Sequence, residues 1–268
     1  MYSDPSTLND VQFLVSSPNR LDVFGSIRTA SRPRYELRER TKASRVTLSR
    51  ILGDLEDRGW IERRSGEYTL TPRGAVIQRE VAQLFANLEA LDGLDDSLPW
   101  LPVELFDFDL ACLTDATVVT STERNVTAAI THMATCVREA TRVRNVARGI
   151  SAEVVDAYLE AATHEDRSLE TILCASVFET IRYDPTLQEQ LHAMLASDRI
   201  AVRRYDGPEP PIILTVADDV VHMCGQSNPK SPPESLETSN DRVCRWAVSY
   251  IDDVRAGATP VTPEAFTA

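Results

Sequence analysis

Residues 34–74 constrain the fold more than any other part of the chain, because signals for two helices, a tight turn and a hairpin follow one another with few residues between them. The first helix is expected over residues 34–41. Residues 42–44 form a small polar connection, which is short enough to hold two helices at a steep angle. Farther on, Ser65-Gly66 separates two β-prone runs and indicates a tight turn. This order predicts a small helical unit with a β-hairpin attached.

The second helix of this segment is predicted to bury one face and to expose a polar one. Ser44 is its natural N-cap, and Gly59 ends it. Its apolar side chains recur at intervals of three and four residues and form one stripe: Leu48, Ile51, Leu52 and Leu55. The cap and the polar face of the first two turns are predicted to contact base edges in the major groove or phosphates: Ser44, Arg45, Thr47, Ser49 and Arg50.

The hairpin adds a second group of predicted DNA contacts. Its first strand begins near Trp60, and Pro72 opens the helix that follows its second strand. Arg63 and Arg64 carry charge outward and are expected to reach phosphates or the minor groove. Tyr68, on the returning strand, is the third predicted contact from the hairpin.

The net charge of this region differs in sign from that of the whole chain. The 268 residues carry 28 Lys plus Arg and 41 Asp plus Glu, a formal net charge of −13. Between Arg20 and Arg79, however, 14 basic residues face 8 acidic ones, a surplus of six positive charges. Affinity for nucleic acid depends on cations clustered near the phosphates, so the local surplus favours DNA binding. A basic helical hairpin that contacts other proteins is the alternative.

Arginine supplies almost all of the positive charge, since only Lys42 and Lys230 are lysines. A carboxylate-rich surface stays hydrated in concentrated salt, where the apolar stem of lysine is a disadvantage. The composition therefore favours a salt-adapted, haloarchaeal type of protein, and a GC-rich genome is the alternative explanation. In molar salt, DNA affinity would rest on close contacts and shape more than on long-range attraction.

The run LGDLEDRGWIERRSGEYTLTPRG, residues 52–74, together with the helices before it, resembles the winged helix-turn-helix transcriptional regulators of the MarR and ArsR kind, especially those of archaea. The resemblance is specific in the order and spacing of its elements. It implies an α+β winged helix fold for the N-terminal domain. It also implies that double-stranded DNA is the partner and that the protein is a homodimer.

The flanking segments suggest how the chain is divided. Residues 11–31 contain an apolar face and are expected to form the first helix of the DNA-binding domain. Residues 75–91 have apolar side chains at helical spacing, and this helix either contacts its twin across a dimer axis or folds back on its own domain. The run LPWLP at 98–102 favours a rigid connector, and the boundary is expected near residue 95. The predicted parts are a winged helix-turn-helix domain (1–74), a linker helix (75–95) and an effector domain (96–268).

The part from residue 96 onward alternates strand-like and helix-like runs, which indicates an α/β domain. The expected strands are 116–120, which is read as a short buried strand, then 141–147, 169–177, 200–205, 212–217 and 220–224. The expected helices are 125–140, 151–163, 178–196 with an interruption at 184–185, and 240–255.

This layout resembles the effector domains of archaeal regulators, both the methanogenesis-regulator type and the sugar-sensing TrmB type, whose fold is phospholipase D-like. Residues 213–228 are also similar to the catalytic strand and loop of phospholipase D enzymes, in which H-x-K precedes G-S-x-N. Here Met223 and Cys224 follow His222, so the lysine that holds the phosphate is absent. We therefore predict no catalytic residue and no enzyme. A degenerate phosphodiesterase targeted by a winged helix is the alternative.

A ligand pocket is expected where strands end and helices begin in an open α/β sheet. Arginine near a helix start would favour an anionic effector, such as a phosphorylated sugar or an organic acid. Capping and surface ion pairs are the alternative roles for the same side chains. The candidates are Ser121, Thr122, Arg124 and Asn125 after the first strand, Arg148 after the second, and Ser176 after the third.

No other chemistry is indicated. Phosphate-loop patterns are absent, and we expect no cofactor. The four histidines show no metal-ligand spacing, so surface positions and no metal site are predicted: they are His132, His164, His192 and His222. Five widely spaced cysteines favour buried thiols over disulfides or a zinc ribbon, with a redox pair as the alternative. Without a signal pattern or a membrane-spanning apolar run, a cytoplasmic protein is expected, with no membrane partner.

The combined prediction is a dimeric, sequence-specific DNA-binding transcriptional regulator. Its effector domain is expected to respond to a small molecule or a protein partner.

Overall fold

The computed structural model describes residues 4–94, 97–122, 124–228 and 231–263. Contacts between residues divide the chain into two compact units, Met1–Ala86 and Asn87–Ala268, which are described separately. The division falls inside a long helix, α5 (Pro72–Leu94), and not near residue 95 as the composition suggested. The expected linker helix is therefore the last part of a helix that begins immediately after the hairpin.

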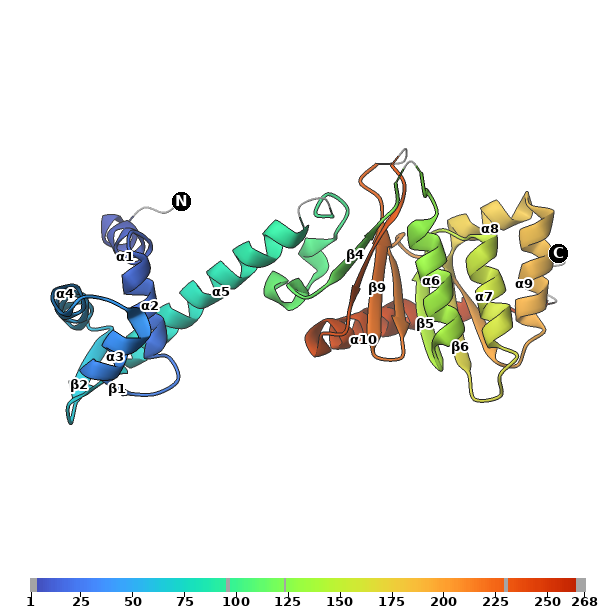
Figure 1. Ribbon diagram of the computed structural model, residues 1–268. Helices are drawn as coiled ribbons and strands as arrows, with labels where there is room; N and C mark the ends of the chain where they lie inside the picture. The colour runs from blue at the N-terminus through green and yellow to red at the C-terminus, as the bar shows by residue number, and fades with distance from the viewer. Residues whose placement is uncertain (1–3, 95–96, 123, 229–230, 264–268) are drawn as a thin grey trace. The chain divides into compact units, whose positions relative to one another are not determined.

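The N-terminal unit is built from short helices and a small sheet (Figure 1). In chain order its elements are α1 (Pro5–Val15), α2 (Pro18–Ser26), β1 (Arg32–Pro33), α3 (Arg34–Thr41), α4 (Arg45–Asp57), β2 (Ile61–Arg64), β3 (Glu67–Leu70) and the start of α5. The predicted pair of helices is confirmed as α3 and α4, and the hairpin as β2 and β3. Two helices replace the single one expected over residues 11–31, because Pro18 occupies a helix start and opens α2.

Two glycines and one buried ring fix the geometry of the hairpin. Gly59 adopts a left-handed conformation (φ 65°) and ends α4. Ser65 and Gly66 both have positive φ, which is the requirement of the two-residue turn that best fits twisted strands. Trp60 follows Gly59 directly in the sequence. Its side chain is fully buried, and its ring packs against Phe13 and Phe24. The hairpin is therefore anchored in the core of the helical unit.

The second unit is an α/β domain, as predicted (Figure 1). After α5 and two short 3-10 helices (Val103–Leu105 and Leu110–Leu113), its elements are β4 (Thr117–Thr120), α6 (Ala128–Glu139), β5 (Arg142–Ala147), α7 (Ala152–Ala161), β6 (Ser168–Cys174), α8 (Ala175–Arg182), α9 (Pro185–Leu195), β7 (Ile200–Tyr205), β8 (Ile213–Ala217), β9 (Val220–Gly225), β10 (Glu234–Thr238), α10 (Asp241–Ala256) and β11 (Ala258–Pro260). Strands β10 and β11 were not predicted, since both are short and lie in polar or proline-containing sequence.

The sheet of this unit has the order β11-β7-β6-β5-β8-β9-β10-β4. Strands β5, β6 and β7 are parallel, and the other pairs are antiparallel. One expectation fails here. Strand β4 is a half-exposed edge strand and not a buried one, and β8, β9 and β10 lie between it and β5.

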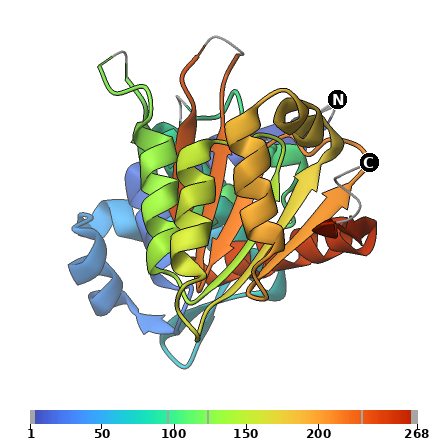
Figure 2. The same ribbon diagram turned by 90° about the vertical axis from the view of Figure 1, so that its right-hand side faces the viewer.

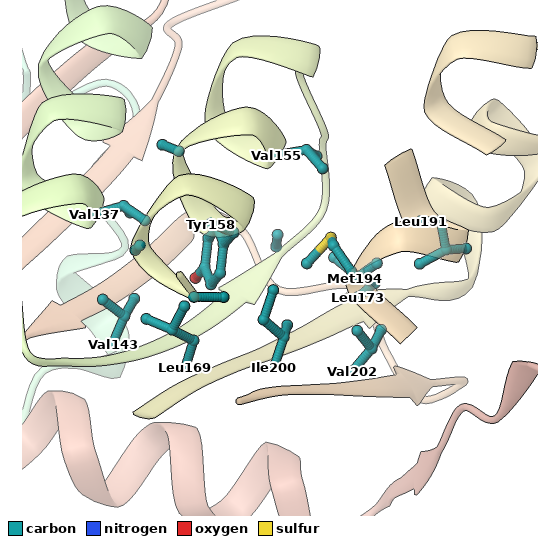
Figure 3. Packing of buried hydrophobic residues seen from close by; sticks show 14 of the residues in the cluster. Val137, Val143, Val155, Tyr158, Leu169, Leu173, Leu191, Met194, Ile200 and Val202 are labelled. Atoms are coloured by element: carbon teal, nitrogen blue, oxygen red, sulfur yellow. The ribbon is translucent and has the colours of Figure 1, made fainter. Parts of the chain in front are cut away.

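Helices cover both faces of the sheet (Figure 2). Helices α6, α7 and α9 bury one face, where Val143, Leu169 and Val202 of the strands meet Tyr158 and Met194 of the helices (Figure 3). Helix α10 covers the other face, on which Val146, Ile172, Leu214 and Met223 lie. Alternate residues of each strand therefore enter different cores, as the pleat of a sheet requires.

The run at 98–102 is not a free connector. Trp100 and Leu101 are buried in the core beneath α10, and the indole Nε1 of Trp100 donates a hydrogen bond to Glu234 Oε2 at 2.8 Å. Gly225 allows this packing, since a Cβ there would lie 2.5 Å from the indole. The segment belongs to the second unit because its apolar side chains complete that core.

Candidate functional site

Helix α4 presents one polar face at the surface of the N-terminal unit. Its buried stripe is as predicted, with Leu48, Ile51, Leu52 and Leu55 each at most 1% exposed. Ser44 caps the helix, because its Oγ accepts a hydrogen bond from the backbone N–H of Thr47 at 3.1 Å. Burial of one face and capping of the first turn together hold the opposite face in a fixed direction.

The predicted contact residues of this helix are accessible. Ser44, Arg45, Ser49 and Arg50 are exposed, and Thr47 is half-buried beside the cap. Val46, which sequence reasoning missed, is 81% exposed in the same first turn. An apolar side chain at that position can contact the methyl group of thymine. Val46 could have been found from the sequence, because it is an apolar residue on the polar side of an amphipathic helix.

Three arginines line a hollow of about 540 Å³ between the starts of α3 and α4 and the turn of the hairpin. They are Arg34, Arg38 and Arg45. A guanidinium N–H of Arg34 donates to the backbone oxygen of Arg45 at 3.2 Å, which ties the two helix starts together. Arg34 and Arg38 were not among the predicted site residues, although their spacing of four residues places them on one face of α3. The hollow concentrates positive charge beside the polar face of α4.

The hairpin residues separate into two groups. Arg63 and Arg64 are exposed, and Arg64 forms a surface ion pair with Glu62 at 2.7 Å. Tyr68 is 5% exposed and packs in the core of the unit. The prediction that Tyr68 contacts DNA is wrong for its ring, because the alternation of β3 turns position 68 inward and leaves Glu67 exposed.

The ligand residues predicted in the second unit do not form one site. Ser176, in the first turn of α8, donates from Oγ to Glu209 Oε2 at 3.0 Å, and Arg148 pairs with the other carboxylate oxygen of Glu209 at 3.3 Å. These two residues are brought together because β5 and β6 are neighbours. The four candidates that follow β4 lie at the edge of the sheet, with β8, β9 and β10 between β4 and β5.

The residues after β4 have local structural roles. Thr122 and Asn125 exchange backbone hydrogen bonds of 3.0 Å in a tight turn, in which Arg124 is exposed. The buried Oγ of Ser121 accepts from the backbone N–H of Ala129, in the first turn of α6, at 3.3 Å, although Thr127 and not Ser121 is the N-cap residue of that helix. This arrangement holds the start of α6 against the end of β4.

A cavity of about 220 Å³ lies beneath α6 and α7 in the second unit. None of the described residues that line it carries a charge. Its polar part is a chain of three side chains on neighbouring strands: Asn145 donates to Thr215 at 2.8 Å and accepts from Thr171 at 2.9 Å. Tyr158 also lines it, and burial raises the pKa of its hydroxyl. Such a cavity suits a small, largely apolar molecule with a polar end.

A group of metal-ligand residues lies on the same face of the sheet, although none was predicted. His132 and Cys136 of α6 meet His222 of β9 and Glu237 of β10, with one ligand atom of each residue within 4.8 Å of the others. The prediction that the histidines lie singly at the surface is wrong for His132 and His222. The spacing of four residues between His132 and Cys136 was a usable signal, but only sheet pairing places His222 opposite Glu237.

Burial affects the protonation of this group. It lowers the pKa of His222 to about 4, against the opposing effect of the charge on Glu237, so the imidazole is neutral near pH 7. Burial also raises the pKa of the Cys136 thiol to about 11, and the negative charges of Glu237 and Glu139 add to this shift. In the absence of a bound cation, Cys136 is therefore a neutral thiol.

The cysteines are all free thiols, in agreement with the absence of a disulfide framework. Only Cys174 is fully buried, however, and the other four are half-buried. In the part of the chain that the structure describes, no helix has both the length and the apolar character needed to cross a bilayer.

Two family models match the chain. Residues 8–92 match the HVO_A0261 N-terminal domain, which covers the helices and hairpin described above. Residues 126–257 match the middle domain of the methanogenesis regulatory protein FilR1, which covers most of the second unit. None of the curated proteins matches the chain.

Several solved structures resemble the chain at low identity. The archaeal chromatin protein TrmBL2 is 12% identical, with a TM-score of 0.44 over 93% of this chain and 99% of that one. Nuc of Salmonella typhimurium, a phospholipase D family member, is 11% identical, with a TM-score of 0.45 over 55% of this chain and 98% of that one. An IclR family regulator of Brucella abortus is 13% identical, with a TM-score of 0.25 over 92% and 94%. At these scores, none of the likenesses decides the fold or the function.

The two family matches follow one another along the chain, with residues 93–125 between them. The chain is therefore similar to the HVO_A0261 N-terminal domain over its N-terminal part and to the FilR1 middle domain over much of its second unit.

Proposed function

We propose that this protein is a transcriptional regulator whose N-terminal unit is a winged helix-turn-helix that binds double-stranded DNA in a sequence-specific manner. In this proposal α4 is the recognition helix in the major groove, and the β2–β3 hairpin is the wing beside it. The match to a domain of a regulatory protein supports the regulatory role.

The observation that carries the proposal is the exposed polar face of α4. Arg45, Ser49 and Arg50 lie outward from a helix whose other face is buried, next to the basic hollow formed with Arg34 and Arg38. A B-DNA major groove admits an α-helix, and arginine pairs well with guanine there. Exposed cations beside the groove would bind phosphates and set the register of the helix.

The test is equilibrium binding to DNA fragments recovered by genomic immunoprecipitation of the tagged protein. If Arg50 makes a bidentate contact with a base, Arg50→Ala should cost roughly 1–3 kcal/mol on the preferred sequence and relax the base preference. Arg182→Ala, which removes an exposed arginine of α8, is the matched control and should leave binding unchanged. Equal affinity and an unchanged footprint for Arg50→Ala would refute the assignment.

We also propose that the protein is a homodimer through α1 and the first part of α5. Leu8, Val11 and Val15 of α1 and Val76 and Leu84 of α5 are each about half exposed, and they flank an apolar groove of about 640 Å³ within the N-terminal unit. A second copy could bury these side chains, and two-fold symmetry suits paired half-sites in DNA. In sedimentation experiments Leu84→Glu should yield monomers, whereas a change of the exposed Tyr183 to Glu, at the C-cap of α8, should not.

For the second unit we propose an effector role without catalysis. The uncharged cavity under α6 and α7 favours a small, mostly apolar effector held by Asn145 and Thr171, whereas an anionic effector at Arg148 and Ser176 would have to displace Glu209. A compound screen by thermal shift should give hits that Thr171→Val abolishes if the cavity is the site. Hits that depend on Arg148 instead would favour the anionic site.

The phospholipase D-like assignment of this unit stays a prediction. A phosphodiesterase would need His222 within reach of a substrate, but this side chain is 1% exposed beneath α6. Turnover of a generic phosphodiester that His222→Ala abolishes would contradict the non-catalytic role.

We infer further that the protein is adapted to concentrated salt, as its acidic, lysine-poor composition suggests. Its stability to urea should then rise steeply between dilute buffer and molar potassium chloride. A flat response would assign the composition to the genome alone.

A further inference from the structure

We propose that His132, Cys136, His222 and Glu237 form a binding site for a divalent transition metal ion of the zinc type. The site lies within the second unit and is independent of the proposed DNA contacts. It would join α6 to strands β9 and β10, which are distant from that helix in the sequence.

The four side chains converge because of secondary structure that is fixed for other reasons. His132 and Cys136 are four residues apart and lie on one face of α6. His222 and Glu237 are direct partners in the antiparallel pairing of β9 with β10, so their side chains lie on the same face of the sheet. Neighbouring positions on these strands, Met223 and Leu236, enter the opposite core under α10, which confirms this orientation.

The distances suit a tetrahedral ion after small movements. Zinc bonds of about 2.0–2.1 Å to nitrogen and about 2.3 Å to sulfur place neighbouring ligand atoms roughly 3.3–3.6 Å apart in a tetrahedron. Here His222 Nδ1 and Glu237 Oε2 are 3.6 Å apart, and Cys136 Sγ and His132 Nε2 are 3.8 Å apart. His132 Nε2 and Glu237 Oε2 are closer, at 2.6 Å. This pair is hydrogen-bonded and would have to open to admit an ion.

One buried nitrogen in the group is otherwise unexplained. His222 Nδ1 has no hydrogen-bond partner among the described residues, although the side chain is 1% exposed. A buried polar atom without a partner is costly, and most proteins avoid it. Coordination of an ion through Nδ1 would remove that cost. The half-exposed His132 and Glu237 give an ion a route from solvent.

The donor set identifies the class of metal. Two imidazoles and a thiol favour zinc and similar divalent ions over magnesium or calcium, which prefer oxygen ligands. Four protein ligands leave no open position in a tetrahedron, so the site would be structural or regulatory and not catalytic. The widely spaced cysteines pointed away from a zinc ribbon, and this site agrees with that conclusion because it uses a single cysteine.

Titration of the full-length, untagged, reduced and chelator-treated protein with Co²⁺ would test the proposal. We expect one ion per chain, with the visible bands of tetrahedral cobalt and a near-ultraviolet sulfur-to-cobalt band, and we expect Zn²⁺ to displace it. Cys136→Ser should remove the sulfur band. Removal of a residue that hydrogen-bonds to a metal ligand typically lowers metal affinity roughly 10–100-fold. Removal of a ligand itself, by substitution of His132 with Ala, should therefore weaken Co²⁺ binding by about 100-fold or more.

Matched controls separate this site from other thiols and imidazoles. Cys244→Ser replaces a half-buried cysteine on α10, and His164→Ala replaces an exposed histidine, so both should bind Co²⁺ as the unmodified protein does. If a His222 variant fails to fold, Glu237→Gln can be used in its place, because it changes another of the four ligands and keeps the size of the side chain. Absence of stoichiometric binding, or a sulfur band that survives Cys136→Ser and disappears in Cys244→Ser, would overturn the proposal.

Discussion

Arg63 lies directly opposite Tyr68 in the β2–β3 hairpin, with its guanidinium carbon 5.7 Å from the centre of the tyrosine ring. The ring is 5% exposed, whereas Arg63 is exposed. The sequence had assigned DNA contact to both residues, but only Arg63 is exposed. Tyr68 attaches the hairpin to the core, and Arg63 carries charge at the surface.

Removal of the Tyr68 ring should mainly affect stability. Tyr68→Ala should lower the free energy of unfolding by about 3 kcal/mol, as expected for truncation of a buried aromatic side chain. Tyr35→Ala is the control, since Tyr35 is 66% exposed and its loss should cost no more than about 0.5 kcal/mol. Urea denaturation of both variants measures the difference. Equal losses for the two would mean that the Tyr68 ring does not anchor the hairpin.

The two hairpin arginines should act on DNA affinity through charge. Each phosphate contact adds roughly 0.9 to the slope of log affinity against log salt concentration, so the double variant Arg63→Ala/Arg64→Ala should reduce that slope by about 2. Affinity for all sequences should fall alike. Fluorescence anisotropy at several salt concentrations gives the slope, and a loss confined to one sequence would instead make the hairpin a reader of bases.

Gly74 should tolerate no side chain, although it lies in the first turn of a helix. A Cβ at this position would lie 1.8 Å from the backbone oxygen of Trp60, so Gly74→Ala must displace the hairpin from α5 and should cost about 2 kcal/mol or more. Gly53 in α4 is the control, because a Cβ there would have no atom within 4 Å beyond its own helix backbone and chain neighbours. Gly53→Ala should therefore stabilise the protein by about 0.5–1 kcal/mol. Thermal unfolding should shift in opposite directions for the two variants.

Glu170 should make the free energy of unfolding depend on pH in the acid range. Burial raises the pKa of this carboxyl, but hydrogen bonds from Arg255 at 2.8 Å and Arg203 at 2.9 Å, with the charge of Arg144, outweigh burial and hold the pKa below its usual value of 4.5. A group with a lowered folded pKa stabilises the protein above its unfolded pKa, and this contribution is lost as the pH falls through the folded value.

Replacement of this carboxylate should therefore matter near neutral pH and less in acid. At pH 7, Glu170→Gln should cost about 2 kcal/mol, because charged hydrogen bonds from Arg203 and Arg255 to the carboxylate are lost. The difference between the variant and the unmodified protein should shrink as the pH falls below 4.5, the usual value of the carboxyl. Urea unfolding at a series of pH values would measure it, and a constant difference would exclude the ionised carboxylate as its source.

Local sequence determined much of the N-terminal unit. The N-cap at Ser44, the left-handed Gly59 and the 65–66 turn act over a few residues, so helix and hairpin positions could be predicted from them. The exposed face of α4 followed from helical spacing alone. Tyr68 could not be placed in the same way, because alternation along a short strand leaves open which face the core covers.

In the second unit, local signals located most helices and strands but not the order of the strands. Strand β4 comes first along the chain of this unit, but the tertiary structure places it at the sheet edge beyond β10. The predicted ligand residues were separated for this reason. Trp100 likewise appeared to belong to a connector, and only its contacts with Glu234 and Gly225 place it in the core.

The sequence by itself determined the kind of protein: a basic unit with helix, turn, helix and hairpin signals, followed by an acidic α/β domain. Only the tertiary structure brought His132 and Cys136 to His222 and Glu237, since strand pairing and helix packing join residues about a hundred positions apart. Capping, turn geometry and periodicity are properties of neighbouring residues and can be read along a chain. A site made by long-range contacts has no such local signal, because its free energy arises from surfaces that meet only in the folded protein.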